Sequence, residues 1–391
     1  MPSKMRKRGE NSYELTVTNG YDFQGKQIMI RKTIQATSDR DARKQYSQFE
    51  AEVRSGAIIK TGKLKLAEFA EQWFRDYCQV KLAPMTLRNY KRYLERRIIP
   101  AMGHIDMVDL KPYHIVPFIN SLLTPEKRLD GKSEPVTGQA AAYCYRVLSS
   151  MLNTAVKWQV IPSNPCDRVD PPVIKRPHTS AFTENEALNM LNMLSNEEIK
   201  YRIMISLAVT TGLRLGELLG LMWTDIDFYR NVLQVNRSCQ SLAGHGVFTK
   251  EPKNESSIRC VTLPNTIMEM FIQYKAWQDQ EKAQLGNQWM QGDWVFTTWN
   301  GSLLNPSTVS HWFHKFLKRN GLPEIPFHGL RHTSATLLLS EGASLKNVSS
   351  RLGHSDIRTT GNIYAHALQS VDKQLAQKMD VFLNKGSDKE L

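Results

Sequence analysis

The side chains most suited to chemistry stand close together near the C-terminal end of the sequence. His328 and Arg331 lie three residues apart in HGLRH, at an expected helix start whose backbone N–H groups and partial positive charge favour an anion. His354 is the last residue of the motif LGH, and Tyr364 follows ten residues later on an expected short helix. Singly, these residues would be a helix cap, a surface arginine and a half-buried tyrosine. Together they indicate a site for an anionic substrate.

A second arginine stands in an otherwise apolar helical stretch, TGLRLGELLGL. Arg214 and Glu217 are three residues apart and can share a helix face, so this stretch taken alone favours a buried ion pair. A lysine able to protonate a leaving hydroxyl comes from TKEPKNESSIRCVTLP, an expected strand-connecting hairpin, with Lys253 as the first choice and Lys250 as the alternative. His332 points to another side of its helix and is expected to pack inside the protein.

Two guanidinium groups, two imidazoles, a lysine and a phenol, without a cluster of carboxylates for Mg²⁺, suit metal-free chemistry on a phosphodiester. Arg214 and Arg331 would each donate bidentate hydrogen bonds to non-bridging phosphate oxygens. They would thereby neutralise the charge that builds in a pentacoordinate transition state. Tyr364 would be the nucleophile. Because the ordinary pKa of a phenol is about 10, it needs nearby positive charge and a base, which His328 or His354 could supply.

The composition agrees with an anionic partner. In 391 residues, 51 Lys and Arg against 38 Asp and Glu give a formal net charge of +13, which makes nucleic acid the first candidate, although charge alone does not decide it. Five scattered cysteines lack the pairing of a zinc site and are expected to be reduced core residues, and we expect neither a metal nor a cofactor. The charged N-terminus lacks an apolar leader, and no run approaches the roughly 20 apolar residues of a membrane span, so we expect a cytoplasmic protein with no membrane partner.

The first part of the chain predicts a compact basic module. Within residues 1–60, alternating β-branched stretches broken by Asn-Gly and Gln-Gly indicate a small antiparallel sheet, and a helical stretch follows. Arg31 and Lys32 on such a sheet could lie in a DNA groove, although basic residues on a small sheet are more often a solvated face.

The remainder predicts two larger domains, so that the whole chain is multidomain and mainly α with small β-sheets. Residues 64–170 place apolar side chains at helical spacing and predict a bundle. The Pro-rich segment 171–180 cannot continue a helix and predicts a linker. Residues 181–384 predict a mixed, mostly helical domain with a C-terminal tail helix, in which NVLQVNRS and SIRCVTLP form strands of a small sheet joined by a long basic connection.

These boxes give the chain a close resemblance to the tyrosine recombinases, also called the phage integrase family. The matching residues are Arg214 in TGLRLGELLGL, His328 and Arg331 in HGLRH, His354 in LGH, and Tyr364. The resemblance is strong over residues 182–382. The helical segment 64–170 is similar to the family's core-binding domain, and residues 1–60 more loosely resemble the arm-binding domain of integrases from phages and conjugative transposons.

The resemblance implies a site-specific DNA recombinase, an integrase that integrates and excises a mobile element. Tyr364 would attack the scissile phosphate and form a 3′-phosphotyrosyl link, which the freed 5′-hydroxyl of the partner duplex would then attack. Because the bond energy stays in the protein–DNA ester, neither ATP nor a metal is needed. The implied roles are a phosphate clamp for Arg214 and Arg331, general acid/base for His328, phosphate hydrogen-bond donor for His354, general acid for Lys253, and an accessory role for Glu217, which orients Arg214.

The resemblance also implies partners. The enzyme would hold double-stranded DNA at arm and core attachment sites and assemble as a homotetramer on DNA, with an excisionase and a host DNA-bending protein as further partners. The tail helix carries an apolar stripe that could pack on its own domain or on a neighbouring protomer, formed by Leu368, Val371, Leu375, Met379 and Phe382.

Three other functions fit the sequence less well. A type IB topoisomerase would share the chemistry but needs no separate N-terminal module. A non-enzymatic DNA-binding protein has no need of Tyr364 beside two histidines and two arginines, and a metal-dependent nuclease needs carboxylates near the histidines, where LGHSD offers only Asp356. A prophage and a conjugative transposon both remain open as the source of the element.

Overall fold

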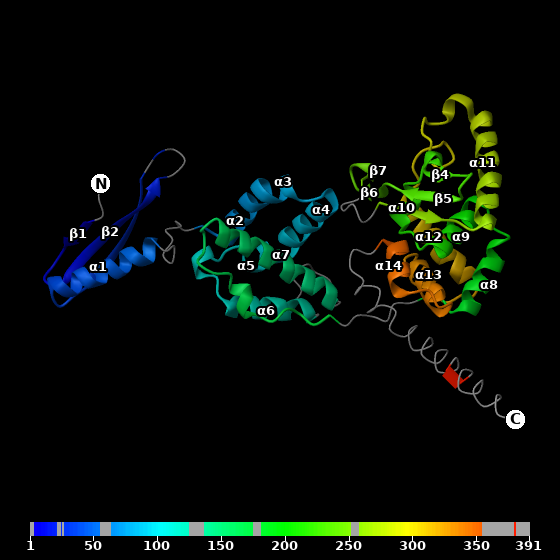
Figure 1. Cartoon of the computed structure of the whole chain (residues 1–391). Coiled ribbons are helices and arrows are strands. Elements are labelled where there is room, and N and C mark those ends of the chain that lie inside the picture. Colours follow the sequence, from blue (N-terminus) through cyan, green and yellow to red (C-terminus); the bar gives the residue numbers. More distant parts are fainter. Residues whose placement is uncertain are drawn as a thin grey trace. The chain divides into compact units, whose positions relative to one another are not determined.

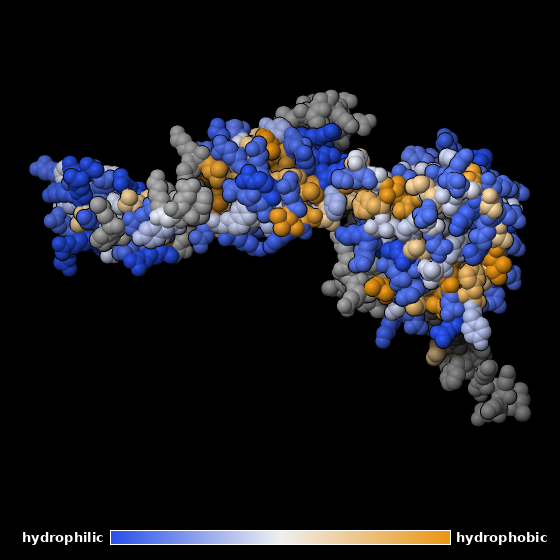
Figure 2. Space-filling model, turned by 90° about the horizontal axis from the view of Figure 1, so that it is seen from above, coloured by the Kyte–Doolittle hydropathy of each residue, from blue (hydrophilic) through white to orange (hydrophobic). Residues whose placement is uncertain are grey.

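The computed structural model describes residues 4–21, 25, 27–54, 64–124, 137–174, 181–251, 258–353 and 379–380 (Figure 1). The chain divides into two compact units, Met1–Arg176 and Pro177–Leu391. The expected class, mainly α with small β-sheets, is confirmed. Figure 2 shows a largely hydrophilic surface with separate apolar patches. Among the helices of the described ranges, none is long and apolar enough to cross a membrane.

The first unit begins with a three-stranded antiparallel sheet and one helix. In chain order these elements are β1 (Lys4–Lys7), β2 (Ser12–Tyr21), β3 (Gln27–Gln35) and α1 (Asp39–Arg54). Buried apolar side chains from the sheet and from α1 make a small core of their own, with Leu15 and Phe49 among them. The antiparallel sheet that the alternating pattern predicts is confirmed, and so is the helix predicted to follow it.

The strand register separates the two basic residues that the sequence singles out. Leu15 pairs with Lys32 and Thr16 pairs with Arg31, so the buried Leu15 places Lys32 on the face covered by α1. There the Lys32 ammonium lies 5.7 Å from the centroid of the Phe49 ring. Arg31 is on the opposite face, so of this pair only Arg31 can contribute to a basic surface away from α1.

The rest of the first unit is a helical bundle. Its elements are α2 (Leu66–Trp73), a π-helical turn (Phe74–Cys78), α3 (Gln79–Lys81), α4 (Pro84–Tyr93), a second π-helical turn (Leu94–Ile98), α5 (Ile99–Met102), a 3₁₀ turn (Met107–Asp109), α6 (Pro112–Leu123), α7 (Gly138–Lys157) and a 3₁₀ turn (Pro165–Arg168). The fully buried Trp73 donates its Nε1–H to Thr154 Oγ1 of α7 at 3.1 Å. The Tyr145 hydroxyl lies 2.8 Å from the Cys166 carbonyl oxygen, which holds the following segment against α7. The predicted bundle is confirmed.

The C-terminal unit is mostly helical with two small sheets. Its elements are α8 (Glu184–Leu194), α9 (Ile199–Thr211), α10 (Leu215–Leu219), a 3₁₀ turn (Trp223–Asp225), β4 (Ile226–Asp227), β5 (Val232–Val235), β6 (Ser238–Leu242), β7 (Gly246–Lys250), β8 (Arg259–Thr262), α11 (Asn265–Leu285), a 3₁₀ turn (Gly286–Gln288), α12 (Pro306–Arg319), α13 (Gly329–Ser340) and α14 (Leu345–Leu352). Strands β4, β5 and β8 form one antiparallel sheet, and β6 and β7 form a hairpin between β5 and β8 in the chain. The two strands predicted from NVLQVNRS and SIRCVTLP are confirmed as β5 and β8.

The core of the C-terminal unit is built around α9. Helices α11 and α13 pack against α9, and α14 packs against α13 and β8. A capping box opens α8, in which the Thr183 backbone N–H donates to Glu186 Oε2 at 2.7 Å. One expectation is wrong: Cys260 is exposed, since its side chain points outward from β8, while the other four cysteines are buried.

Candidate active site

Arg214 owes its position to the end of one helix and the start of the next. Gly212 closes α9 in the left-handed region at φ 66°, a conformation that glycine adopts without strain. The chain then passes through the buried Leu213, and Arg214 becomes the N-cap residue of α10. The Arg214 side chain keeps 40% of its surface exposed. Its guanidinium can therefore reach a ligand from a well-defined backbone.

Glu217 joins Arg214 to another arginine. Glu217 Oε1 accepts a hydrogen bond from Arg214 Nη1 at 2.6 Å, and Oε2 accepts one from the Arg214 backbone N–H at 3.0 Å. Arg259 Nη2, from β8, donates to the same Oε2 at 2.9 Å. Burial raises the pKa of the Glu217 carboxyl, but the hydrogen bond and charge of Arg259, together with those of Arg214, hold that pKa below its ordinary value. The expected ion pair is confirmed, and it has an additional partner.

Arg331 is tied to the turn that carries Arg214. Arg331 lies on α13 and is only 2% exposed. Its Nη1 donates to the Gly212 carbonyl oxygen at 2.8 Å, across 119 residues of sequence. Because Gly212 comes two residues before Arg214, this bond sets the second arginine against the loop of the first.

His328 stands at the N-terminus of α13, where it is the N-cap residue. Its pKa is lowered, first by partial desolvation and then by the positive charges of Arg331 and Arg214. An imidazole whose pKa is lowered is mostly neutral near pH 7 and can accept a proton.

His332 packs inside the protein, as expected, but it lies one helical turn beyond His328 on the same side of α13 and not on another side. Its ring centroid is 4.9 Å from that of His328, with the planes at 89°. Burial, followed by the positive charges of His328 and Arg331, lowers the pKa of His332 from 6.5 to about 4. The buried ring thus supports His328 as a neutral packing partner.

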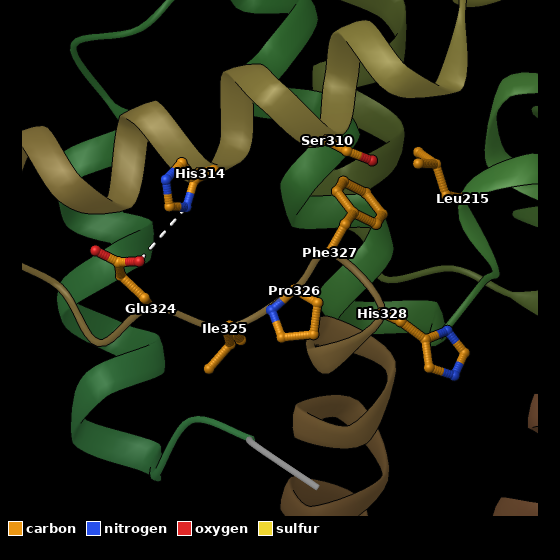
Figure 3. A pocket seen from close by; sticks show the side chains of 8 residues that line it. All are labelled: Leu215, Ser310, His314, Glu324, Ile325, Pro326, Phe327 and His328. Atoms are coloured by element: carbon orange, nitrogen blue, oxygen red, sulfur yellow. Dashed lines mark ion pairs between the residues drawn. The ribbon is translucent and has the colours of Figure 1, made fainter. Parts of the chain in front are cut away.

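A cavity of about 470 Å³ opens beside His328 (Figure 3). In Figure 3 the His328 ring lies at one end and the His314–Glu324 ion pair at the other; His314 Nδ1 is 3.6 Å from Glu324 Oε2. The lining residues are Leu215, Ser310, His314, Glu324, Ile325, Pro326, Phe327 and His328. The cavity is thus built from the segment before α13, from α12 and from the first residue of α10.

Three of the predicted site residues, Lys253, His354 and Tyr364, lie outside the described residues. For two of them, a residue near in sequence is described. Lys250, the alternative to Lys253, is the last residue of β7, and Gly353, the C-cap of α14, directly precedes His354. The structure thus brings together Arg214, Glu217, His328 and Arg331. Among the described residues, no group of three or more His, Cys, Asp or Glu side chains is placed to hold a metal ion.

The sequence interpretation missed Arg259. Its side chain is 8% exposed and bonds to Glu217. The signal was present in the strand SIRCVTLP, because alternation places Arg259 on the same face as the buried Val261. An arginine on the inward face of a strand requires a partner, and the acidic residue of TGLRLGEL supplies it.

Substitution of Gly212 tests the turn that positions Arg214. A Cβ at this position would lie 2.3 Å from Leu352 Cδ2, and the positive φ adds backbone strain. We expect Gly212→Ala to lower the free energy of unfolding of the C-terminal unit by more than the ~1–3 kcal/mol of strain alone. Gly321→Ala is the matched control, because Gly321 has φ +64° and no atom within 4 Å of its Cβ. Urea unfolding with hydrogen exchange in α9 and α13 measures both, and equal losses would contradict the contact with Leu352.

The lowered pKa of His332 predicts a pH-dependent stability. Its pKa is about 4 in the folded protein against 6.5 ordinarily, so between these values the unfolded chain binds more protons. Stability is therefore complete above pH 6.5 and falls as the pH is lowered towards about 4. We expect His332→Gln to flatten the fall of the melting temperature between about pH 7 and about pH 5, where most carboxylates stay ionised. An unchanged slope in His332→Gln would show that His332 titrates normally.

Comparison with known proteins identifies the family. The model of the phage integrase family matches residues 180–370, and that of the phage integrase N-terminal SAM-like domain matches residues 65–123. The integrase of Mycobacterium phage L5 is 30% identical over 325 residues, covering 81% of this chain and 79% of that protein. A tyrosine recombinase XerC-like protein of Caldanaerobacter subterraneus is 29% identical over 387 residues, covering 93% of this chain and 94% of that protein.

Solved structures share the fold. The Tn1549 transposon integrase in complex with transposon right end DNA aligns with a TM-score of 0.66 at 20% identity, over 80% of this chain and 99% of that one. A lambda integrase tetramer bound to a Holliday junction aligns with a TM-score of 0.54 at 20% identity, over 91% of this chain and 96% of that one. The family model and these relatives show that the chain belongs to the phage integrase family and is a tyrosine-type site-specific recombinase.

Proposed function

We propose that this recombinase is the integrase of a mobile element and that Tyr364 is its nucleophile, forming a 3′-phosphotyrosyl link with attachment-site DNA. The observation that carries the proposal is the hydrogen bond from Arg331 Nη1 to the Gly212 carbonyl, which sets Arg331 against the loop of Arg214. This bond brings Arg331 to the turn that carries Arg214, and guanidinium groups suit the non-bridging oxygens of a phosphodiester.

The electrostatics of the described residues support a phosphate clamp. Arg214 and Arg259 share the carboxylate of Glu217, so the cluster keeps positive charge after the ion pairs form. Arg331 adds a further guanidinium that is already desolvated. Charges held in a dry, preorganised site stabilise a developing negative charge more strongly than the same charges in water.

The proton transfers are assigned by chemistry. The neutral His328 is suited to act as a general acid/base towards the Tyr364 hydroxyl, and His354 would donate a hydrogen bond to the phosphate. Lys253 would protonate the leaving 5′-oxygen, with Lys250 as the alternative. The phosphodiester bond to the 5′-oxygen breaks as the bond to the Tyr364 oxygen forms, and a 5′-hydroxyl of the partner duplex later reverses the exchange without ATP.

The N-terminal segments are proposed to hold the DNA. Residues 1–60 would bind arm sites through the sheet face away from α1, where Arg31 lies, and residues 64–170 would join residues 181–384, across the linker 171–180, in clamping the core site. A homotetramer would bring two core sites together, as supported by the lambda integrase tetramer. An excisionase and a host DNA-bending protein would be further partners, in the cytoplasm of a bacterial host.

A covalent-trapping experiment tests Tyr364. A nicked duplex carrying the element's attachment core is incubated in EDTA with the wild type, with Tyr364→Phe, and with the control Tyr229→Phe, whose tyrosine is fully exposed on the C-terminal unit. On a denaturing gel, we expect a slower protein band that carries DNA for the wild type and Tyr229→Phe only. If no protein forms this band while all bind the DNA, the site is not catalytic and the proposal fails.

The identity of the general acid is tested with a better leaving group. Replacing the bridging 5′-oxygen by sulfur removes the need for a proton, because a thiol ionises far more readily than an alcohol. The Lys253→Met variant should cleave ordinary DNA about 10²–10⁴-fold more slowly than the wild type. It should cleave the sulfur-containing DNA at nearly the wild-type rate. Lys250→Met is the matched control and should be close to wild type on both. The reverse pattern would assign the role to Lys250.

A further inference from the structure

Arg259 lies where β8, α10 and α14 meet, next to residues of the proposed active site. It is the first residue of β8, and its side chain is 8% exposed. Its Nη2 donates to Glu217 Oε2 at 2.9 Å, and its Nε donates to the Arg351 carbonyl oxygen at 2.8 Å. One guanidinium therefore connects the carboxylate that faces Arg214 to the end of α14.

The end of α14 is shaped to receive this guanidinium. Gly353, the C-cap, has φ 69°, and a Cβ there would lie 2.9 Å from Arg259 Nη1. The carbonyl groups at a helix C-terminus carry partial negative charge and favour a cation. Arg214 Nη2 also lies 3.4 Å from the Gly353 carbonyl oxygen. Arg351 is directed elsewhere, with Nη2 donating to the Thr210 carbonyl at 3.1 Å.

The sharing of Glu217 has an electrostatic consequence. With Arg259 in place, Glu217 gives one oxygen to the Arg214 guanidinium and the other to Arg259 and the Arg214 backbone. Without Arg259, both carboxylate oxygens could form a bidentate pair with Arg214. Such a pair would neutralise Arg214 and turn its donors away from a ligand.

We propose that Arg259 is a positioning residue for strand cleavage: it takes up part of the charge of Glu217 so that Arg214 stays cationic towards the scissile phosphate. This inference rests on the proposed function, because it assumes that Arg214 binds that phosphate. Arg259 does not touch the DNA in this role. Its effect reaches the phosphate only through Glu217 and Arg214.

The experiment compares two DNA substrates. Nicked attachment-core duplexes carry either the normal phosphate or a neutral methylphosphonate at the scissile position, and covalent-complex formation is timed with the full-length wild type and Arg259→Met. On the phosphate we expect Arg259→Met to be about tenfold to a hundredfold slower, the equivalent of one lost hydrogen bond between charged groups. On the methylphosphonate the difference between the two proteins should be much smaller, because one non-bridging oxygen and its negative charge are absent.

Two further variants separate charge from packing. Arg237→Met is the matched control, since Arg237 also pairs with a buried carboxylate, that of Asp225, but does not contact Glu217; it should not change the ratio of the two substrate rates. Adding Glu217→Gln to Arg259→Met removes the uncompensated charge, and this double variant should cleave phosphate DNA faster than Arg259→Met alone. Recovery of cleavage in the double variant would also show that a protein without Arg259 still folds.

The outcomes are distinct. Equal slowing of Arg259→Met on both substrates, or no recovery in the double variant, would overturn the charge-sharing role and leave Arg259 as a packing residue. Wild-type rates for Arg259→Met on phosphate DNA would overturn any role in cleavage. If the wild type itself forms no covalent complex, the proposed function fails first, which is read directly from the wild-type lanes.

Discussion

The buried carboxylate of Glu217 is the interaction on which the site depends. A carboxylate removed from water carries a penalty of several kcal/mol unless charged partners and hydrogen bonds replace its solvation. Here the backbone N–H of Arg214 and the guanidinium groups of Arg214 and Arg259 supply that replacement. The same bonds hold α10 to β8, so the elements that contribute these side chains cannot shift independently.

A second constraint acts through the backbone at Gly212. The left-handed residue ends α9 and lets the chain turn directly into α10, while its carbonyl accepts a bond from the buried Arg331 of α13. The close approach of Leu352 from α14 leaves no room for a side chain at this turn. Four helices therefore meet at one glycine, and the geometry of the two arginines follows from their packing. Under the proposed function this rigidity is useful, because both arginines would act on one phosphate.

The chain has several separate hydrophobic cores. The sheet-and-helix module and the helical bundle each have their own apolar cluster. In the module, strand alternation leaves Arg31 on the face away from α1 and places Lys32 over Phe49. The number of basic residues on a strand therefore exceeds the number on any one face of the sheet, since adjacent residues face opposite sides. The C-terminal unit uses its small sheets differently: β8 turns one arginine inward to complete the charge balance of the site.

The sequence by itself predicted most of the secondary structure and the residues Arg214, Glu217, His328 and Arg331 that the structure brings together. Helical periodicity and the alternating strands correspond to the observed elements, because each depends on neighbours a few residues apart. The boxes with Arg214, His328 and Arg331 were recognisable for the same reason. Only the tertiary structure showed that Arg259 shares Glu217, that Arg331 bonds to the Gly212 carbonyl, and that Cys260 faces outward. The Arg259 and Arg331 contacts join residues 42 and 119 positions apart, and no local pattern specifies which distant carboxylate or carbonyl will satisfy a buried guanidinium. That choice is made by the packing of α9, α13, α14 and β8 around one glycine turn.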